Sequence, residues 1–282
     1  MNILTFDIED WFHVLDNPIT KHPSSWDSFE KRVDYGLNII LDLLDKYNVT
    51  ATFFCLGWIA EKYPKLIKQI SSKNHHIGSH SFNHQLVYEL SYDQFKEDTI
   101  KSVNILSDLT GKKINAYRAP GFSITKNNVW AIKLLLELGF KYDSSIFPAP
   151  RSHGGFQSIN QKKPFIFSYE GLELIEFPMT YKNIFKLKFA ITGGGYFRLF
   201  PKSIINSFIK SESYNMVYLH PRDFDIKQPM IPGLNKIRKF KSYYGISGAK
   251  SKLDSILVNH SWSSIIDNEE NDFLTNLNKI SL

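Results

Sequence analysis

Two histidines four residues apart give the most specific chemical signal in this sequence. If their segment turns helically, His80 and His84 lie on one face and can share a divalent ion. A histidine pair at this spacing is also compatible with surface or capping positions. A carboxylate beside the pair would favour a catalytic centre, because two histidines and one carboxylate leave coordination positions open on zinc or iron(II).

Three carboxylates occur within four residues near the start of the sequence, at Asp7, Glu9 and Asp10. Side chains alternate along an extended segment, so Asp7 and Glu9 should share a face. Crowded carboxylates repel one another, and a cation among them relieves that cost. The alternative interpretation is a group of exposed loop acids that includes a helix N-cap.

Short apolar strands alternate with segments of helical period along most of the chain. Strands are predicted over 3–6, 49–56, 77–79, 114–117, 140–142, 172–177 and 216–219. Helices are predicted over 27–47, 59–72, 91–111, 125–139 and 201–213. This alternation predicts an α/β fold with a parallel sheet and helices outside it, and seven strands favour a barrel. Asp27 and Glu30 are predicted to cap the first helix, and residues 144–164 to form a long loop.

The candidate residues follow the predicted strands. The acids come after the first strand and the histidine pair after the third, while Arg118, Asp143 and His220 end later strands. In a parallel barrel the carboxyl ends of all strands open on one face, where loops build the active site. We therefore expect residues more than 200 positions apart to meet in one pocket.

Length and composition restrict the class of protein. The chain has 282 residues, 43% hydrophobic residues, one cysteine and a net charge of +6. The length suits one barrel of roughly 250 residues with a short extension, so we expect a catalytic barrel over 1–226 and a packed extension over 227–282. The sequence carries no secretion signal or apolar run of membrane-spanning length, and a single thiol fits a reducing compartment. We expect a cytoplasmic protein without specific nucleic-acid binding; peripheral membrane association stays open, and the sequence does not give the oligomeric state.

Five motifs together resemble those of the NodB-type polysaccharide deacetylases, carbohydrate esterase family four. The likeness covers about residues 1–225 and implies a distorted, TIM-like (β/α)7 barrel. Three further segments, 11–13, 193–198 and 220–225, resemble a bacterial subgroup associated with exopolysaccharide biosynthesis. The five motifs are Thr5-Phe6-Asp7-Ile8-Glu9-Asp10, His80-Ser81-Phe82-Asn83-His84, Arg118-Ala119-Pro120-Gly121-Phe122, Asp143-Ser144-Ser145 and Tyr218-Leu219-His220.

The resemblance implies roles for the acids and the histidine pair. Asp7 matches the general base of the family, and a second acid joins the two histidines on a divalent metal, with Zn²⁺ the expected ion. The common form of the motif has adjacent aspartates, whereas Ile8 intervenes here. Glu9 is therefore the preferred metal ligand, and Asp10 is the alternative.

The resemblance also implies roles for residues from the later motifs. Arg118 matches the arginine that pairs with the base, and the backbone N–H of Gly121 matches the oxyanion donor. His220 would protonate the departing sugar amine, and Asp143 would orient that imidazole.

Several further residues are weaker candidates. Phe122, Trp11 and Tyr196 could line a groove on which a sugar stacks, although aromatic residues are more often part of the core. Arg222 and Asp223 could surround His220, or they could form a surface pair.

The implied activity is metal-dependent removal of N-acetyl groups from a sugar of a polysaccharide, a lipid-linked oligosaccharide or a related precursor. The substrate partner would be an N-acetylated glycan or glycolipid. A cyclic-amide hydrolase of the allantoinase type is an alternative on the same barrel, and a catalytically inactive glycan-binding protein is another.

Overall fold

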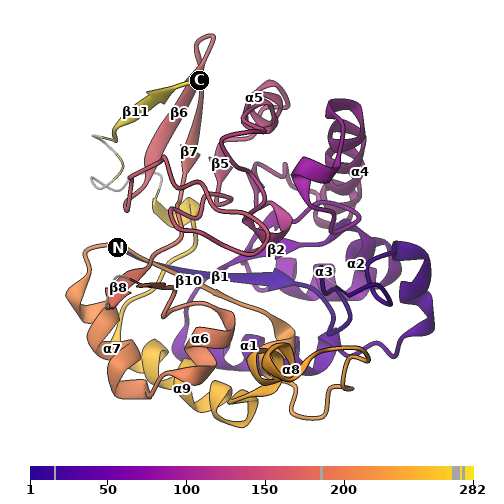
Figure 1. Cartoon of the computed structure of the whole chain (residues 1–282), viewed down its shortest axis with the longest axis vertical. Coiled ribbons are helices and arrows are strands. Elements are labelled where there is room, and N and C mark those ends of the chain that lie inside the picture. Colours follow the sequence, from indigo (N-terminus) through magenta and orange to yellow (C-terminus); the bar gives the residue numbers. More distant parts are fainter. Residues whose placement is uncertain (16, 185–186, 269–273, 275–276) are drawn as a thin grey trace.

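A nine-stranded, mostly parallel sheet runs through the protein (Figure 1) in the order β10-β1-β2-β3-β4-β5-β7-β6-β11. The computed structural model describes residues 1–15, 17–184, 187–268, 274 and 277–282. The strands of this sheet are β1 (Asn2–Ile8), β2 (Thr52–Cys55), β3 (His76–Ser79), β4 (Ala116–Tyr117), β5 (Tyr142–Asp143), β6 (Phe165–Tyr169), β7 (Leu172–Glu176), β10 (Asn215–Leu219) and β11 (Lys279–Ser281). A separate antiparallel pair comprises β8 (Lys182–Ile184) and β9 (Leu187–Phe189).

All seven predicted strands are present, and they pair in parallel as consecutive neighbours from β10 to β7. The segment after β7 lies against β10, where Tyr214 donates a hydrogen bond to the Pro178 carbonyl at 3.0 Å. Thr180 likewise donates to the carbonyl oxygen of Met216 at 3.3 Å. These contacts bring the two sides of the parallel sheet together, which gives the distorted barrel that the sequence predicts.

Four strands, β6, β8, β9 and β11, were not predicted from the sequence. β6 pairs antiparallel with β7 across a tight hairpin, in which Glu170 and Gly171 both have positive φ. Two residues with positive φ are typical of a turn that matches the twist of a hairpin. Figure 1 shows β6, β7 and β11 together at the top of the molecule, next to the C-terminal end.

Helices cover the outside of the sheet (Figure 1), with α4 and α5 on one side and α1, α6, α7 and α9 on another. The helices are α1 (Val33–Tyr47), α2 (Gly57–Lys62), α3 (Pro64–Ser72), α4 (Tyr92–Thr110), α5 (Trp130–Glu137), α6 (Gly194–Leu199), α7 (Lys202–Ser211), α8 (Lys236–Tyr243) and α9 (Ile246–Asn259). The predicted helix over 59–72 is two helices that meet at Pro64, where proline provides the first residue of α3. The 144–164 segment contains no helix or strand, as predicted.

The predicted cap of the first helix is wrong. Asp27 lies in a separate 3₁₀ turn, and α1 begins only at Val33, after an N-cap residue, Arg32, that makes no side-chain cap. The carboxylate that caps α1 is that of Asp10, which accepts hydrogen bonds from the backbone N–H groups of Arg32 and Val33 at 2.8 and 3.1 Å. A side chain distant in sequence therefore does what a local capping box was expected to do.

Helix α1 packs directly against the turn that follows β10. This 3₁₀ turn, η4 (Pro221–Asp223), comes immediately after His220. A Cβ atom on Gly36 would lie 1.8 Å from the carbonyl oxygen of Pro221, so only glycine permits this approach. The helix and the turn are thus in backbone contact.

Helix α9 and the residues after it as far as Ile265 pack on the sheet and its helices. Buried residues of α9, including Leu253 and Ile256, belong to the same core as α1 and α7. Beyond α9, Ser263 pairs with Ile3 at the start of β1, and Ile265 is fully buried. None of the described helices is long and apolar enough to cross a membrane.

Candidate active site

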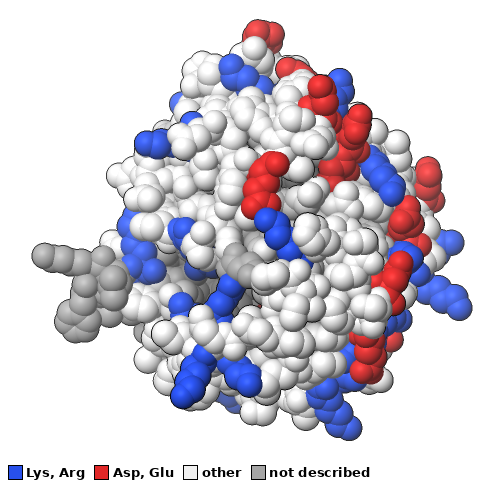
Figure 2. All heavy atoms as spheres, turned by 45° about the vertical axis from the view of Figure 1, so that its right-hand side comes forward, with Lys and Arg blue, Asp and Glu red and all other residues white. Residues whose placement is uncertain are grey.

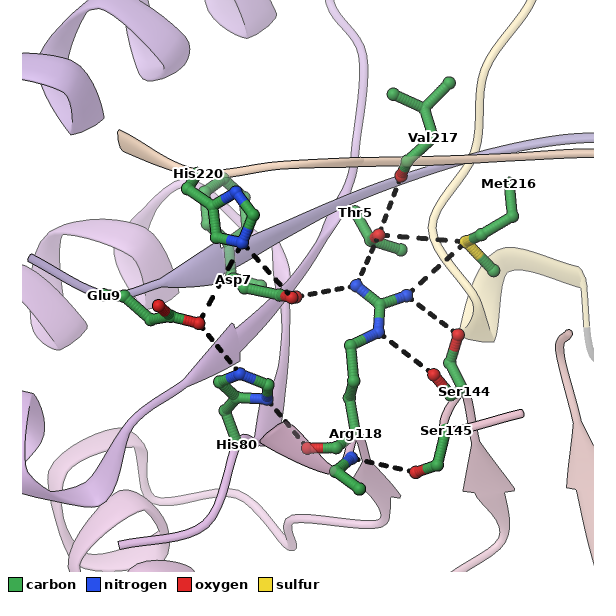
Figure 3. Close-up of polar contacts among 12 residues, drawn as sticks. Thr5, Asp7, Glu9, His80, Arg118, Ser144, Ser145, Met216, Val217 and His220 are labelled. Carbon is green, nitrogen blue, oxygen red and sulfur yellow. Dashed lines mark hydrogen bonds and ion pairs between the residues drawn. The ribbon is translucent and has the colours of Figure 1, made fainter. Parts of the chain in front are cut away.

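The carboxyl ends of β1, β3, β4 and β10 bring the predicted polar residues together (Figure 3). Asp7 belongs to β1, His80 and Arg118 directly follow β3 and β4, and His220 follows β10. These ends open into a cleft of about 520 Å³, which is lined by Asp7, Glu9, His80, His84 and His220 among other residues. The topology thus places residues from both ends of the sequence in one hollow, as a parallel barrel requires.

Both histidines of the pair contact the same oxygen of Glu9. The Nε2 atoms of His80 and His84 each lie 3.0 Å from Glu9 Oε1, and all three side chains are buried. Ligand atoms of these three residues lie within 4.8 Å of one another, as do those of Asp7, Glu9 and His220. The two sets share Glu9, so one small space adjoins all five side chains.

The histidine pair is held by a turn rather than by the helix that the sequence analysis considered. Ser81 and His84 have positive φ, which is uncommon for residues other than glycine. The turn is fixed by Asp98, whose carboxylate accepts hydrogen bonds from the backbone N–H groups of Phe82 and Asn83 at 2.7 and 2.9 Å. A strained backbone held at a polar site is typical of functional positions.

The donor set fits a divalent metal ion. His80 Nδ1 lies 2.7 Å from the carbonyl oxygen of Arg118, and a carbonyl can only accept, so this nitrogen carries the hydrogen. In the neutral ring, Nε2 then directs a lone pair at the carboxylate oxygen of Glu9, which is repulsive unless a cation lies among them. A backbone carbonyl that fixes the ring in this way is common behind metal-bound histidine. Two imidazoles and one carboxylate suit Zn²⁺ and related ions.

The charge state of Glu9 agrees with such a site. Burial alone would raise the pKa of this carboxyl, but the charge of a protonated His84 and hydrogen bonds from protonated His80 and His84 outweigh it and hold the pKa well below its usual range, the protons standing where a cation would lie. Glu9 is therefore an anion at neutral pH, as a metal ligand must be.

Asp7 is paired with a fully buried arginine. Arg118 Nη1 donates to Asp7 Oδ1 at 2.7 Å and to Thr5 Oγ1 at 2.8 Å (Figure 3). Its Nη2 donates to Ser144 Oγ at 2.8 Å, and the guanidinium lies over the ring of Phe54. Because Arg118 is anchored on several strands, it holds one oxygen of Asp7 in place and leaves the other directed at His220, 3.9 Å away.

The carboxylate partner of His220 is Asp223, not Asp143. Asp223 Oδ2 lies 3.2 Å from His220 Nδ1 and also accepts the His220 backbone N–H at 2.9 Å. The other oxygen of Asp223 forms an ion pair with Arg198 Nε at 2.8 Å. Burial disfavours the charged imidazole, but the hydrogen bond that the ring donates to Asp223 and the nearby carboxylates raise the pKa of His220 to about 9.

Asp143 lies elsewhere, so the prediction that it orients His220 is wrong. It is fully buried at the end of β5, where its Oδ1 accepts a hydrogen bond from Ser145 Oγ at 2.6 Å. Its Oδ2 and Glu176 Oε2 are both buried without any other partner among the described residues, and the two carboxyl groups interact. A proton shared between them satisfies both oxygens. Burial and the charge of Asp143 accordingly raise the pKa of Glu176 well above its usual range.

Asp10 and Trp11 are not where the sequence analysis placed them. Both oxygens of Asp10 are occupied by backbone N–H groups, one from Trp11 and two from the start of α1. Asp10 is therefore a structural cap, and the prediction that it could be the metal ligand is wrong. Trp11 is 5% exposed and donates to the carbonyl of Glu30, packed against Phe29, so it belongs to the core rather than to a sugar-binding groove.

The remaining predicted residues differ in their distance from the centre. Gly121 and Phe122 line the main cleft, and both have positive φ. Tyr196 instead lines a neighbouring groove, which shares part of its wall with the cleft. Arg222 lines the main cleft beside Asp223.

His13 and Arg198 line the cleft but were not assigned to the site from the sequence. His13 is buried and accepts the Asp10 backbone N–H on Nδ1 at 2.8 Å. Its Nε2 must then carry the hydrogen, and this atom is without a partner in the described part of the chain. Arg198, which pairs with Asp223, lies on α6, and its signal in the sequence was its place at the end of the 193–198 segment. The Trp11-Phe12-His13 sequence was the only available signal for His13.

Comparisons with known proteins match two parts of the chain. Residues 20–142 match the family described as polysaccharide deacetylase, and residues 144–268 match a domain of unknown function (DUF3473). A peptidoglycan-N-acetylglucosamine deacetylase of Bacillus cereus is 39% identical over 93 residues, 33% of this chain and 34% of its own. A peptidoglycan deacetylase of Helicobacter pylori is 34% identical over 113 residues, 40% and 38% of the two chains. The chain thus spans little more than a third of the length of these relatives.

Solved structures with low sequence identity share the fold. A candidate polysaccharide deacetylase of Mycobacterium smegmatis has a TM-score of 0.68 at 18% identity, covering 100% of this chain and 92% of its own. A family 4 carbohydrate esterase pseudoenzyme of Bacillus anthracis has a TM-score of 0.51 at 14% identity, covering 95% and 64%. These structures show that the chain shares their α/β barrel fold. Residues 20–142 carry the likeness to the polysaccharide deacetylase family.

Proposed function

We propose that this protein is a metal-dependent hydrolase that removes N-acetyl groups from a sugar of a glycan or glycan precursor. The observation that carries the proposal is the convergence of His80 and His84 on Glu9, directly beside Asp7 and His220. A site with a base, an acid and an ion-binding donor set has the groups that amide hydrolysis needs. The named relatives are deacetylases, which supports the same reaction class.

The protein residues would divide the reaction between them. His80, His84 and Glu9 would hold a divalent ion, with Zn²⁺ the expected metal, and this ion would polarise the acetamide carbonyl. Asp7, held by Arg118, would accept the proton of the attacking water. His220, held by Asp223, would donate a proton to the departing amine.

Backbone and side-chain groups of the cleft wall would position the substrate. The N–H of Gly121, at the wall of the cleft, is proposed to donate to the developing oxyanion. The Nε2–H of His13 is a second donor available at the cleft wall. A group that finds no partner in the protein is readily used for substrate recognition, because an unsatisfied buried donor is costly.

The test measures metal content and turnover together. Zinc-loaded protein is incubated with chitotetraose and, separately, with allantoin, and mass spectrometry follows loss of one acetyl group or ring opening. We expect deacetylation of the sugar and no reaction with allantoin. His84→Ala should lose both metal and activity, whereas His75→Ala, a buried histidine away from the cleft, should keep the metal. Ring opening of allantoin, or metal-loaded protein inactive on every N-acetylated sugar offered, would contradict the proposal.

The subgroup and the cellular location also stay proposals. An exopolysaccharide as the substrate is consistent with the segments at 11–13, 193–198 and 220–225, which resemble the exopolysaccharide-associated subgroup. A cytoplasmic location is a prediction from sequence, which fractionation of the native host would test.

A further inference from the structure

A second hollow adjoins the catalytic cleft. It has a volume of about 460 Å³, and its lining includes the apolar side chains Leu199, Ile237, Phe240 and Tyr244. We call it the α8 groove, because three of these residues lie on or next to α8. The wall between the groove and the cleft is shared, and its residues are Arg151, Ser152, Gly195, Tyr218 and Lys241.

The apolar residues of the α8 groove are unusually exposed for their size. Ile237 is 68% exposed, Phe240 52%, Tyr244 51% and Leu199 41%. The first three follow one another at spacings of three and four along α8, so they share one side of the helix. Helix α8 has no buried residue, so these side chains do not contribute to the core. A cluster of this kind marks a binding surface more often than it marks a structural need.

Cationic side chains surround the same helix. Four of the eight residues of α8 are basic: Lys236, Arg238, Lys239 and Lys241. Lys241 and Arg151 stand on the wall that the groove shares with the cleft, and neither has an ion pair with a carboxylate in the described part of the chain. Figure 2 shows Lys and Arg side chains gathered around a hollow in this face, while acidic side chains lie mainly along its right-hand edge.

The groove is attached to the catalytic machinery. Arg198, which pairs with Asp223 behind His220, also donates to the carbonyls of Lys241, Ser242 and Tyr244 at 2.8 to 2.9 Å. The C-terminal end of α8 is therefore anchored on the same arginine that supports the proposed catalytic acid. The groove is consequently placed for the same molecule that enters the cleft.

We propose that the substrate is an N-acetylated sugar carried on a lipid phosphate. In this arrangement the sugar lies in the cleft, the phosphate group lies between Arg151 and Lys241, and the start of the hydrocarbon chain lies in the α8 groove. A polar cleft, a cationic wall and an apolar groove are contiguous here. A ligand that occupies all three needs a polar part, an anionic part and an apolar part. A soluble neutral glycan would use the first alone. The inference rests on the proposed function and specifies its substrate class.

The direct test is calorimetric binding of farnesyl diphosphate, compared with inorganic diphosphate and farnesol. We expect farnesyl diphosphate to bind at least roughly tenfold more tightly than inorganic diphosphate, because burying even a few methylene groups supplies that factor. Lys241→Glu should weaken both diphosphates about tenfold or more through charge reversal. Phe240→Ser should remove most of the advantage of the farnesyl chain.

Matched controls lie far from the groove. Lys96→Glu on α4 reverses an exposed charge, and Leu172→Ser at the start of β7 removes an apolar side chain that is 44% exposed. Neither should change binding by more than about twofold. Equal affinity for farnesyl and inorganic diphosphate, or equal loss in the control variants, would overturn the inference. Binding to vesicles of phosphatidylglycerol without binding to farnesyl diphosphate would overturn it too, and would indicate a membrane surface instead.

Turnover separates this inference from the proposed function. If the protein deacetylates chitotetraose but binds no farnesyl diphosphate, the lipid-phosphate substrate is wrong and the deacetylase stands. If it binds farnesyl diphosphate as expected but deacetylates neither chitotetraose nor N-acetylglucosaminyl diphosphoprenol, the reaction class is wrong. A higher kcat/KM on the diphosphoprenol sugar than on chitotetraose, lost in Phe240→Ser, supports both.

Discussion

At the scale of single residues, the site separates a carboxylate that would bind metal from one that would accept a proton. Glu9 contacts both imidazoles of the histidine pair, whereas Asp7 is held by Arg118. Two acids only two positions apart in sequence therefore have different partners and different proposed tasks. Their roles can be tested separately because each has its own contacts.

Asp7→Asn should keep the metal and lose turnover. The amide has nearly the shape of the carboxylate but cannot accept the proton of water, so we expect kcat to fall by roughly 10² to 10⁴. Metal stoichiometry by mass spectrometry should match that of the wild-type protein. Loss of the ion in Asp7→Asn, with retention in Glu9→Gln, would show that the two roles are exchanged.

Asp223→Asn should lower kcat because the amide no longer holds a charged His220. We expect a decrease of at least roughly tenfold, within the range seen for general acid catalysis, and a smaller change in KM. Asp143→Asn is the matched comparison, since sequence resemblance assigned it the same task. It should change the free energy of unfolding rather than kcat, and the reverse pattern would restore the original assignment.

At the scale of elements, Asp10 links the loop that follows β1 to the start of α1. Its carboxylate replaces the local cap that the sequence lacks, and the negative charge is favourable at a helix N-terminus. This link holds the first helix beside the segment that carries Glu9.

Asp10→Ala should destabilise the protein without removing the metal. Losing a helix cap costs roughly 0.5–2 kcal/mol, and here a third N–H, that of Trp11, also loses its acceptor. Chemical denaturation measures the change, and metal analysis should show the stoichiometry of the wild-type protein. A variant that folds normally but binds no ion would make Asp10 a ligand after all.

Much of the fold could be predicted from the sequence, because each parallel strand is a short apolar run with a clear boundary. The centre of the site could be predicted as well, since Asp7, His80 and His220 come directly after such strands or end them. The directions in which the side chains point could not be predicted from the sequence. Asp143 also ends a strand, yet it faces Glu176, which β7 contributes more than thirty residues later. The α8 groove could not be predicted from the sequence either, because its walls come from segments that only the folded chain brings together.

At the scale of the whole molecule, helix α9 and the residues after it as far as Ile265 are part of the central structure. We predict that a chain ending at residue 226 will not fold cooperatively. Helix α9 alone buries Leu253, Ile256 and Leu257, and each such side chain contributes about 1.5–3 kcal/mol. That sum approaches the typical stability of a domain. A chain ending at residue 268 lacks residues 269–282, which include β11, and is the control. It should show a cooperative thermal transition by circular dichroism. Equal behaviour of the two shortened chains would contradict the prediction.

The buried Asp143–Glu176 pair predicts how stability depends on pH. Folded protein keeps a shared proton above the usual carboxyl range, whereas the unfolded chain releases it near pH 4. At this pair the folded state therefore binds more protons, and the contribution of the pair to the free energy of unfolding should fall as pH rises from about 4, by up to about 1.4 kcal/mol per unit. Glu176→Gln should reduce the number of protons released on unfolding by about one, which makes the free energy of unfolding less dependent on pH. Chemical denaturation between pH 5 and 8 measures this. Glu173→Gln, exposed on the same strand, should leave the slope unchanged, and an unaltered slope in Glu176→Gln would exclude the shared proton.

The contact between Gly36 and Pro221 has a mechanical consequence. A single methyl group at position 36 would clash with the backbone of the turn that follows His220, the proposed acid, because these backbone atoms leave no space for it. The helix and the turn would have to move apart. The first helix could then shift the imidazole of His220 without touching substrate or ion. A substitution of Gly36 should therefore affect the site even though this residue is remote from the reacting groups. The packing of a helix on the outside of the barrel helps to fix the position of His220 inside it.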